Sequence, residues 1–135
     1  MKRMKRMKII KNSLGLLLVV LAFISCSADN DSSQQGDQQR LDELLAEIHQ
    51  MAENTSCTDD SNWAFTAYGS KACGGPIGYI IYSTLINTDS FLEKVAFHVS
   101  SQNEFNIKYG IVSDCSVPTM PTGVSCENGQ PTLTY

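Results

Sequence analysis

The sequence predicts a mainly α-helical small domain that is stapled by disulfide bonds. Two segments, 38–54 and 90–110, place apolar residues at helical spacing. Five cysteines in 135 residues leave an even number for disulfides once one is assigned to the N-terminal segment. The length allows a single domain, which we place at 38–135, with a short third helix at 76–86 and a C-terminal hairpin. The alternative is an α+β fold in which 77–86 is a strand.

The N-terminal segment has the composition of a secretory signal. Six of the ten basic residues lie within the first eleven positions, and an uncharged apolar run follows from Leu14 to Ile24. A helix that crosses a bilayer needs about 20 apolar residues, so this run is too short to span one. It is typical of the apolar region of a signal peptide, which we place at 1–25.

The residues that follow indicate lipidation. The sequence FISC at 23–26 resembles the lipobox of bacterial lipoprotein precursors, which implies cleavage before Cys26, acylation of its thiol and attachment to a membrane. The acidic sequence ADND at 28–31 resembles the surface-export signal of Bacteroidota lipoproteins. These resemblances imply a Gram-negative outer membrane, with either leaflet open. An ordinary signal peptide with an incidental cysteine is the alternative.

Charge is distributed unevenly along the chain. Residues 26–37 contain no large apolar side chain, and we expect them to form a flexible acidic tether. After residue 25 the chain carries four basic and fourteen acidic residues, a net charge of −10. This argues against nucleic-acid binding, which needs a basic surface, and it favours a cationic protein partner.

The first predicted helix, 38–54, has one continuous apolar face. Its residues recur at intervals of three and four: Leu41, Leu44, Leu45, Ile48, Met51 and Ala52. Asp37 is suited to cap its start.

The second predicted helix, 90–110, follows the same pattern. Its apolar positions are Phe91, Leu92, Val95, Val99, Phe105 and Tyr109, with Gln102 on the same face. Thr88 or Asp89 is suited to cap its start, and Gly110 is suited to end it.

The segment between these helices and the tail give weaker signals. Pro76 at a first helical position and the spacing of Ile77, Ile81 and Leu85 favour a helix over 76–86. The Ile, Tyr and Thr content of 77–86 favours a strand instead. Asn128-Gly129 predicts a tight turn in a terminal hairpin.

The cysteines beyond Cys26 are expected to form two disulfides. Cys57, Cys73, Cys115 and Cys126 are an even set in an exported small domain. Proximity along the chain favours Cys57–Cys73 and Cys115–Cys126. The alternative bonds one or both late cysteines back to the first half and so ties the tail to the helices.

Catalytic patterns are weak. A small hydrolase or thiol enzyme would use Cys73 as nucleophile, with the backbone of Gly74-Gly75 as an oxyanion hole and His98 as base. The even cysteine count argues against this hypothesis. Cys-x-x-Cys and His-x3-His spacings are lacking, so we predict no metal site and no cofactor.

An aromatic centre is the candidate binding surface. It comprises Trp63, Phe65, Tyr68, Tyr79 and Tyr82. Such side chains line ligand grooves, and in a small domain they also build the core.

The centre of the domain resembles a known kind of chain. The sequence CTDDSNWAFTAYGSKACGGP at 57–76, together with VSDC at 112–115 and CENG at 126–129, resembles small Bacteroidota lipoproteins with a GSKACGGP-type centre. The resemblance implies a shared fold and four structural cysteines, and it transfers no catalytic residue. The sequence therefore predicts a lipid-anchored, non-enzymatic binding or interaction module of the cell envelope. An inhibitor of a cationic enzyme such as lysozyme is the first alternative, and the Cys73/His98 enzyme is the second.

Overall fold

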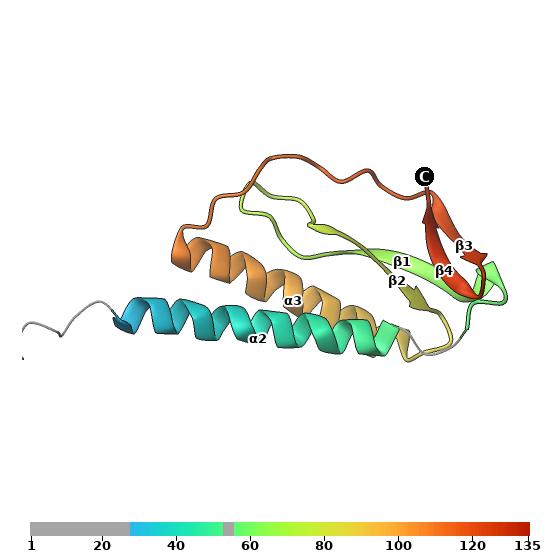
Figure 1. Cartoon of the computed structure of the whole chain (residues 1–135), viewed down its shortest axis with the longest axis horizontal. Helices are drawn as coiled ribbons and strands as arrows, with labels where there is room; N and C mark the ends of the chain where they lie inside the picture. Colours follow the sequence, from blue (N-terminus) through green and yellow to red (C-terminus); the bar gives the residue numbers. More distant parts are fainter. Residues whose placement is uncertain (1–27, 53–55) are drawn as a thin grey trace, which may run out of the picture. The chain divides into compact units, whose positions relative to one another are not determined.

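The computed structural model describes residues 28–52 and 56–135, with side chains from residue 33 onward. Helix α2 spans Ala28–Ala52 and helix α3 spans Thr88–Tyr109. Strands β1 (Trp63–Tyr68) and β2 (Gly78–Ser83) form one antiparallel pair, and β3 (Gly123–Glu127) and β4 (Gln130–Thr134) form another (Figure 1). A short 3-10 helix, η2, covers Asp60–Asn62. The chain divides into two units, Met1–Ser33 and Gln34–Tyr135, and the following description concerns the second.

The prediction of a mainly α fold was wrong, because the structure is α+β. Both predicted long helices are present, but the segment expected as a helix at 76–86 contains strand β2, as the alternative held. β2 pairs along its whole length with β1, from Trp63 opposite Ser83 to Tyr68 opposite Gly78. Paired β-branched and aromatic side chains stabilise this ladder, and Pro76 lies in the loop before it.

The segment that we expected to be a flexible tether, 26–37, is helical from residue 28 onward, because α2 begins at Ala28. Its polar residues make contacts along the helix: Gln38 donates to Asp42 and Gln39 donates to Glu43, each at 2.8 Å. Such pairs four residues apart stabilise a helix that is already formed. The predicted signal peptide and Cys26 lie outside the described residues, as do residues 53 and 54 at the end of the first predicted helix.

The helices lie antiparallel (Figure 1), and residues of both pack with β2 in one core. Asp37 in the first half of α2 meets Lys108 near the end of α3, and Glu47 in the second half of α2 meets Lys94 near the start of α3. The core lies between the helices and the ladder. Its fully buried members are Ile48, Ala52, Ile80, Phe91 and Val95, and Leu44, Met51, Tyr68, Tyr82 and Ile86 pack against them.

The ends of α3 and the terminal hairpin follow their sequence signals. Asn87 caps α3 by accepting a hydrogen bond from Ser90, one residue before the predicted caps, and Gly110 ends the helix in the left-handed conformation. Asn128 and Gly129 form a two-residue turn with φ values of 53° and 79°, as a type I′ hairpin requires. The prediction of this hairpin is confirmed.

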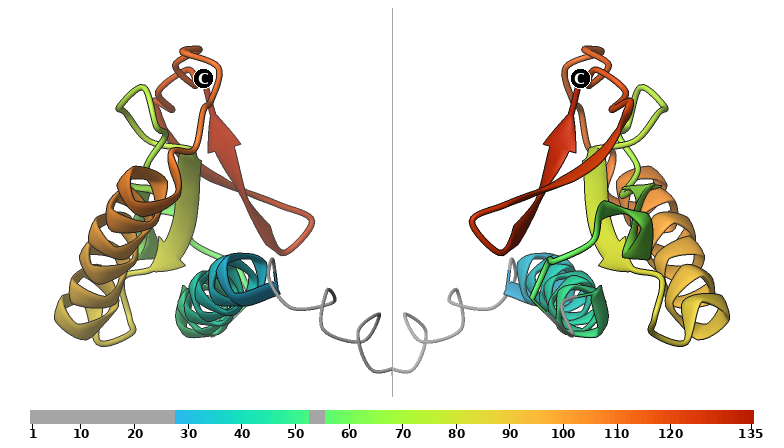
Figure 2. Two further views of the ribbon diagram at one scale, coloured as in Figure 1. Left: turned by 90° about the vertical axis from the view of Figure 1, so that its left-hand side faces the viewer. Right: turned by 90° about the vertical axis from the view of Figure 1, so that its right-hand side faces the viewer.

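The β3–β4 hairpin forms a further layer. β3 contacts β1 and β4 contacts β2, while α3 contacts β1. In Figure 2 the β1–β2 ladder lies between α3 and this hairpin. None of the helices in the part of the chain that the structure describes is long and apolar enough to cross a membrane.

Candidate binding site

The disulfides connect the two halves of the domain, so the predicted local pairing was wrong. Cys57 bonds Cys126 and Cys73 bonds Cys115. Cys57 precedes β1 and Cys73 follows it, so the six residues of β1, about 20 Å of extended chain, separate them. The alternative that ties the tail back to the first half is the one the structure adopts.

The cluster of Cys57, Asp60 and Cys126 has the residue types of a metal site. Both sulfurs are bonded to each other, and the Asp60 carboxylate accepts a hydrogen bond of 2.7 Å from the backbone N–H of Cys126. The cluster therefore joins η2 to β3 and offers no thiolate to a metal.

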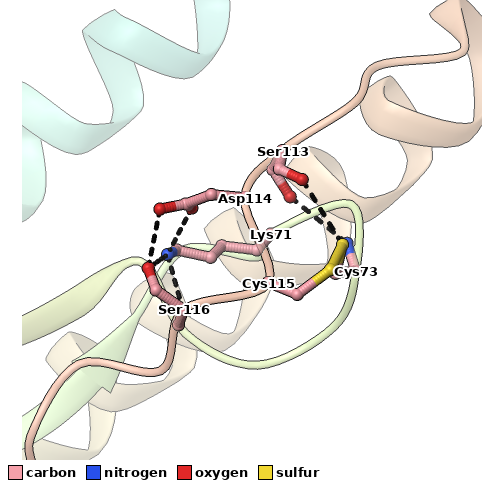
Figure 3. Close-up of polar contacts among 6 residues, drawn as sticks. All are labelled: Lys71, Cys73, Ser113, Asp114, Cys115 and Ser116. Atoms are coloured by element: carbon pink, nitrogen blue, oxygen red, sulfur yellow. Dashed lines mark hydrogen bonds and ion pairs between the residues drawn. A yellow bond between two sulfur atoms is a disulfide. The ribbon is translucent and has the colours of Figure 1, made fainter.

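A polar network surrounds the second disulfide (Figure 3). The Lys71 ammonium donates to Asp114 at 2.9 Å, to the backbone oxygen of Ser116 at 2.7 Å and to the Ser116 hydroxyl at 3.0 Å. The hydrogen bond from Lys71 holds the pKa of the Asp114 carboxyl below its ordinary value, with a smaller contribution from Ser116. No local pattern in the sequence indicates this network, since Lys71 and Asp114 lie 43 positions apart.

The residues of the predicted thiol enzyme occupy other roles. Cys73 is bonded to Cys115, so it supplies no thiolate while that bond is closed. His98 is buried on the inner face of α3, and its Nδ1 atom has no hydrogen-bond partner among the described residues. Burial lowers the pKa of His98, and the charge of Asp42 opposes this effect.

The five aromatic residues of the candidate binding surface divide between the two faces of the ladder. Tyr68 and Tyr82 pack against the helical core, and the ring of Tyr82 lies 4.7 Å from that of Phe91. Cross-strand partners share a face, so Trp63, Phe65 and Tyr79 lie on the opposite face. Phe65 and Tyr79 meet edge to face with ring centres 5.9 Å apart. The candidate binding surface predicted from the sequence therefore combined two aromatic residues of the helical core with three that lie on the opposite face of the ladder.

A pocket of about 480 Å³ contains two of these aromatic residues. Its wall from β4 includes Gln130, Pro131 and Leu133, and its wall from β2 includes three consecutive residues. The complete lining is His49, Ser56, Trp63, Tyr79, Ile80, Ile81, Gln130, Pro131 and Leu133. Small clefts of this mixed polarity are suited to binding. His49 and the β4 residues could not be predicted as part of this site from the sequence, because only the docking of the terminal hairpin brings them to Trp63.

A second, more apolar groove of about 390 Å³ lies between α2 and α3. It is lined by Asp37, Arg40, Leu41, Leu44, Phe97, Ser101, Glu104, Phe105 and Lys108. At its end, Asp37 accepts hydrogen bonds of 2.7 Å from both Lys108 and the Tyr109 hydroxyl, and the hydrogen bond from Lys108 contributes most to lowering the Asp37 pKa. Its charged rim is thus mostly neutralised within the chain.

Among the described residues, every basic side chain forms an ion pair, but most acidic side chains do not. All four basic residues there form ion pairs: Arg40 and Lys108 with Asp37, Lys71 with Asp114, and Lys94 with Glu47. Among the side chains described, in residues 33–52 and 56–135, the acids outside these ion pairs are Asp42, Glu43, Asp59, Asp60, Asp89, Glu93, Glu104 and Glu127. The surface therefore presents uncompensated negative charge.

No family model matches the chain, and searches of curated proteins and of solved structures also find no significant match.

Proposed function

We propose that the protein is a lipid-anchored, non-enzymatic binding module of a Gram-negative outer membrane, and that its partner is a cationic protein. The single observation that supports this proposal is the pairing of charge: the four described basic residues are all used within the chain, and eight acids are left without a cationic partner. Uncompensated charge of one sign attracts a partner of the other sign over a range of about 10 Å at 0.1 M salt.

Binding can be tested with lysozyme as the cationic probe. The full chain in detergent is titrated with lysozyme at low and at physiological salt, and both affinity and lysozyme activity are recorded. We expect measurable affinity at low salt that weakens as salt is added, because screening removes the attraction. Lysozyme with acetylated lysines is the control and should bind much less. A lysozyme that stays fully active identifies a binder without inhibition, whereas a lack of affinity at low salt contradicts binding to this basic protein.

The anchor is tested separately by metabolic labelling with a palmitate analogue. We expect the intact chain to incorporate the label and to fractionate with the outer membrane. The Cys26→Ala variant keeps every residue of the described domain and should incorporate none. Label in that variant, or an unlabelled intact chain, would contradict the assignment of Cys26.

A further inference from the structure

The outer edge of β2 carries unpaired backbone groups. The hydrogen bond of 2.8 Å from the Thr84 N–H to the Asn62 carbonyl fixes the phase of the ladder. With the observed register, even-numbered residues of β2 exchange hydrogen bonds with β1. The N–H and C=O groups of Tyr79 and Ile81 therefore point away from β1, and among the described residues no other strand pairs with them.

The pocket beside Trp63 follows this edge. It is lined by Tyr79, Ile80 and Ile81, whose side chains alternate between the two faces of the ladder. A cavity that touches three consecutive strand residues runs along the strand and not over one face alone. The other lining residues agree, because His49 comes from the helical layer and Leu133 comes from the hairpin layer.

We propose that this edge of β2 binds an extended, cationic segment of a partner polypeptide, which adds a strand to the outer side of the β1–β2 ladder. Extended chains recognise open sheet edges through main-chain hydrogen bonds, and neighbouring pockets receive alternate side chains. The outward groups of Tyr79 and Ile81 lie two residues apart, about 7 Å along a strand, which matches the repeat of an extended partner. This inference rests on the proposed binding function and specifies the site and form of the partner.

The surroundings of the pocket favour lysine or arginine side chains in that segment. His49 also lines a neighbouring shallow cleft on α2, whose other residues include Glu43 and Glu47. Glu43 forms no ion pair within the described residues and is exposed. A cationic side chain that leaves the β2 edge beside His49 would therefore reach uncompensated carboxylate charge.

Amide exchange of the full chain tests the edge directly. In the free protein the amide hydrogens of Ile80 and Tyr82 should exchange slowly, and those of Tyr79 and Ile81 should exchange fast. The probe is a capped heptapeptide of alternating lysine and valine, beginning and ending with lysine. Addition of this peptide should slow exchange at Tyr79 and Ile81 at least tenfold. Unchanged exchange at both residues in the presence of bound peptide would overturn the proposal.

Methylated peptides separate strand addition from simple charge attraction. A heptapeptide methylated at every second backbone nitrogen keeps one free edge and should bind nearly as well as the parent peptide. The same peptide methylated at every backbone nitrogen keeps all charges and side chains but has no backbone donor, and it should bind at least tenfold more weakly. Equal affinity of all three peptides would overturn strand addition and leave the proposed binding of a cationic partner in place.

Two proline variants test the edge from the side of the protein. Ile81→Pro removes an outward N–H of β2, and Ala67→Pro makes the matched change on the outer edge of β1, since Ala67 pairs with Tyr79 in the same phase. We expect about a tenfold loss of peptide affinity for Ile81→Pro and little change for Ala67→Pro. Similar losses in both would contradict the proposal, and the methylated peptides supply the test if Ile81→Pro does not fold.

Comparison with lysozyme keeps the two proposals apart. If the peptides fail to bind but unmodified lysozyme binds with the expected salt dependence, strand addition is wrong and binding of a cationic partner stands. If neither the peptides nor lysozyme binds at low salt, both proposals are wrong.

Discussion

The two ends of the helix pair are held together by different chemistry. At the first end, which we call the apolar end, the late part of α2 and the early part of α3 bury Ile48, Ala52, Phe91 and Val95 against β2. The adjoining disulfide, Cys57–Cys126, includes a buried Cys57, and the Cys57 N–H donates to the carbonyl of Gly129. Hydrophobic burial of this kind depends little on salt or pH.

The other end, which we call the polar end, is joined by side-chain hydrogen bonds and ion pairs. Gln102 accepts from the Ser70 N–H at 3.0 Å, and Asn106 donates to the Ser70 carbonyl at 2.8 Å. These two residues, one helical turn apart on α3, satisfy both backbone groups of Ser70. The disulfide at this end, Cys73–Cys115, is exposed at both cysteines. The contrast indicates that the apolar end stabilises the fold and that the polar end positions the loops at 69–77 and 111–122.

The largest expected effect is at the apolar end. Phe91→Ala should lower the free energy of unfolding by about 3–5 kcal/mol, because Phe91 is completely buried and its removal leaves a cavity. Urea unfolding measures the loss. Leu92→Ala is the matched control on the next residue, which is 38% exposed, and it should cost much less. Equal losses for the two variants would contradict the location of the core.

The two disulfides provide the next comparison. Their sequence separations are 69 and 42 residues, so loop entropy alone gives each about 4 kcal/mol, with little difference between them. The structure predicts a larger loss for the Cys57→Ala/Cys126→Ala pair, because that pair also opens a buried site. Thermal and urea unfolding of both double variants measures this. A loss from Cys73→Ala/Cys115→Ala that equals or exceeds the other would show that the polar end contributes as much to stability as the apolar end.

Features of the fold that depend only on residues close together in the sequence were predictable from it. The apolar period of Leu41 to Ala52 predicted the inner face of α2, and Gly110 and Asn128-Gly129 predicted a helix end and a turn, because local conformation requires those residue types there. Ile77, Ile81 and Leu85 have helical spacing, yet 78–83 is a strand. This segment is a strand because it pairs with β1. Since β1 lies outside residues 77–86, the periodicity of that segment alone could not indicate the pairing.

The candidate site depends on contacts between residues that are far apart in the sequence, and these contacts cannot be inferred from proximity along the chain. Proximity favoured Cys57–Cys73, but β1 holds these residues apart, and the terminal hairpin brings Cys126 to Cys57. The same docking places Leu133 beside Tyr79 in the pocket. Trp63 and Tyr79 were recognised as candidates by residue type alone, while His49 had no local signal.

A smaller effect is expected at the polar end. Asn106→Ala leaves the Ser70 carbonyl without its side-chain donor and should cost about 1–3 kcal/mol. Amide exchange should also become faster in the loop at 69–77, which a general loss of stability would not confine to that region. Asn103→Ala, an exposed site on the same helix, is the control and should change neither quantity. Uniformly faster exchange throughout the chain would contradict the positioning role.

The smallest expected effect concerns the pH dependence of stability. The buried middle of α3, at His98, and the polar end, at Asp37 and Asp114, should lose stability in different pH ranges. Burial lowers the pKa of His98 below 6.5, so the unfolded chain binds a proton more readily, and stability falls as pH drops below about 6.5. The carboxyls of Asp37 and Asp114 have pKa values below 3.8, so their contributions are present above that pH and are lost only below it. His98→Leu should therefore remove the pH dependence of urea unfolding between about pH 6.5 and 5 and keep the loss near pH 3. His49→Gln, at an exposed histidine, should leave both losses in place, and a His98→Leu variant that keeps the upper one would show that another group produces it.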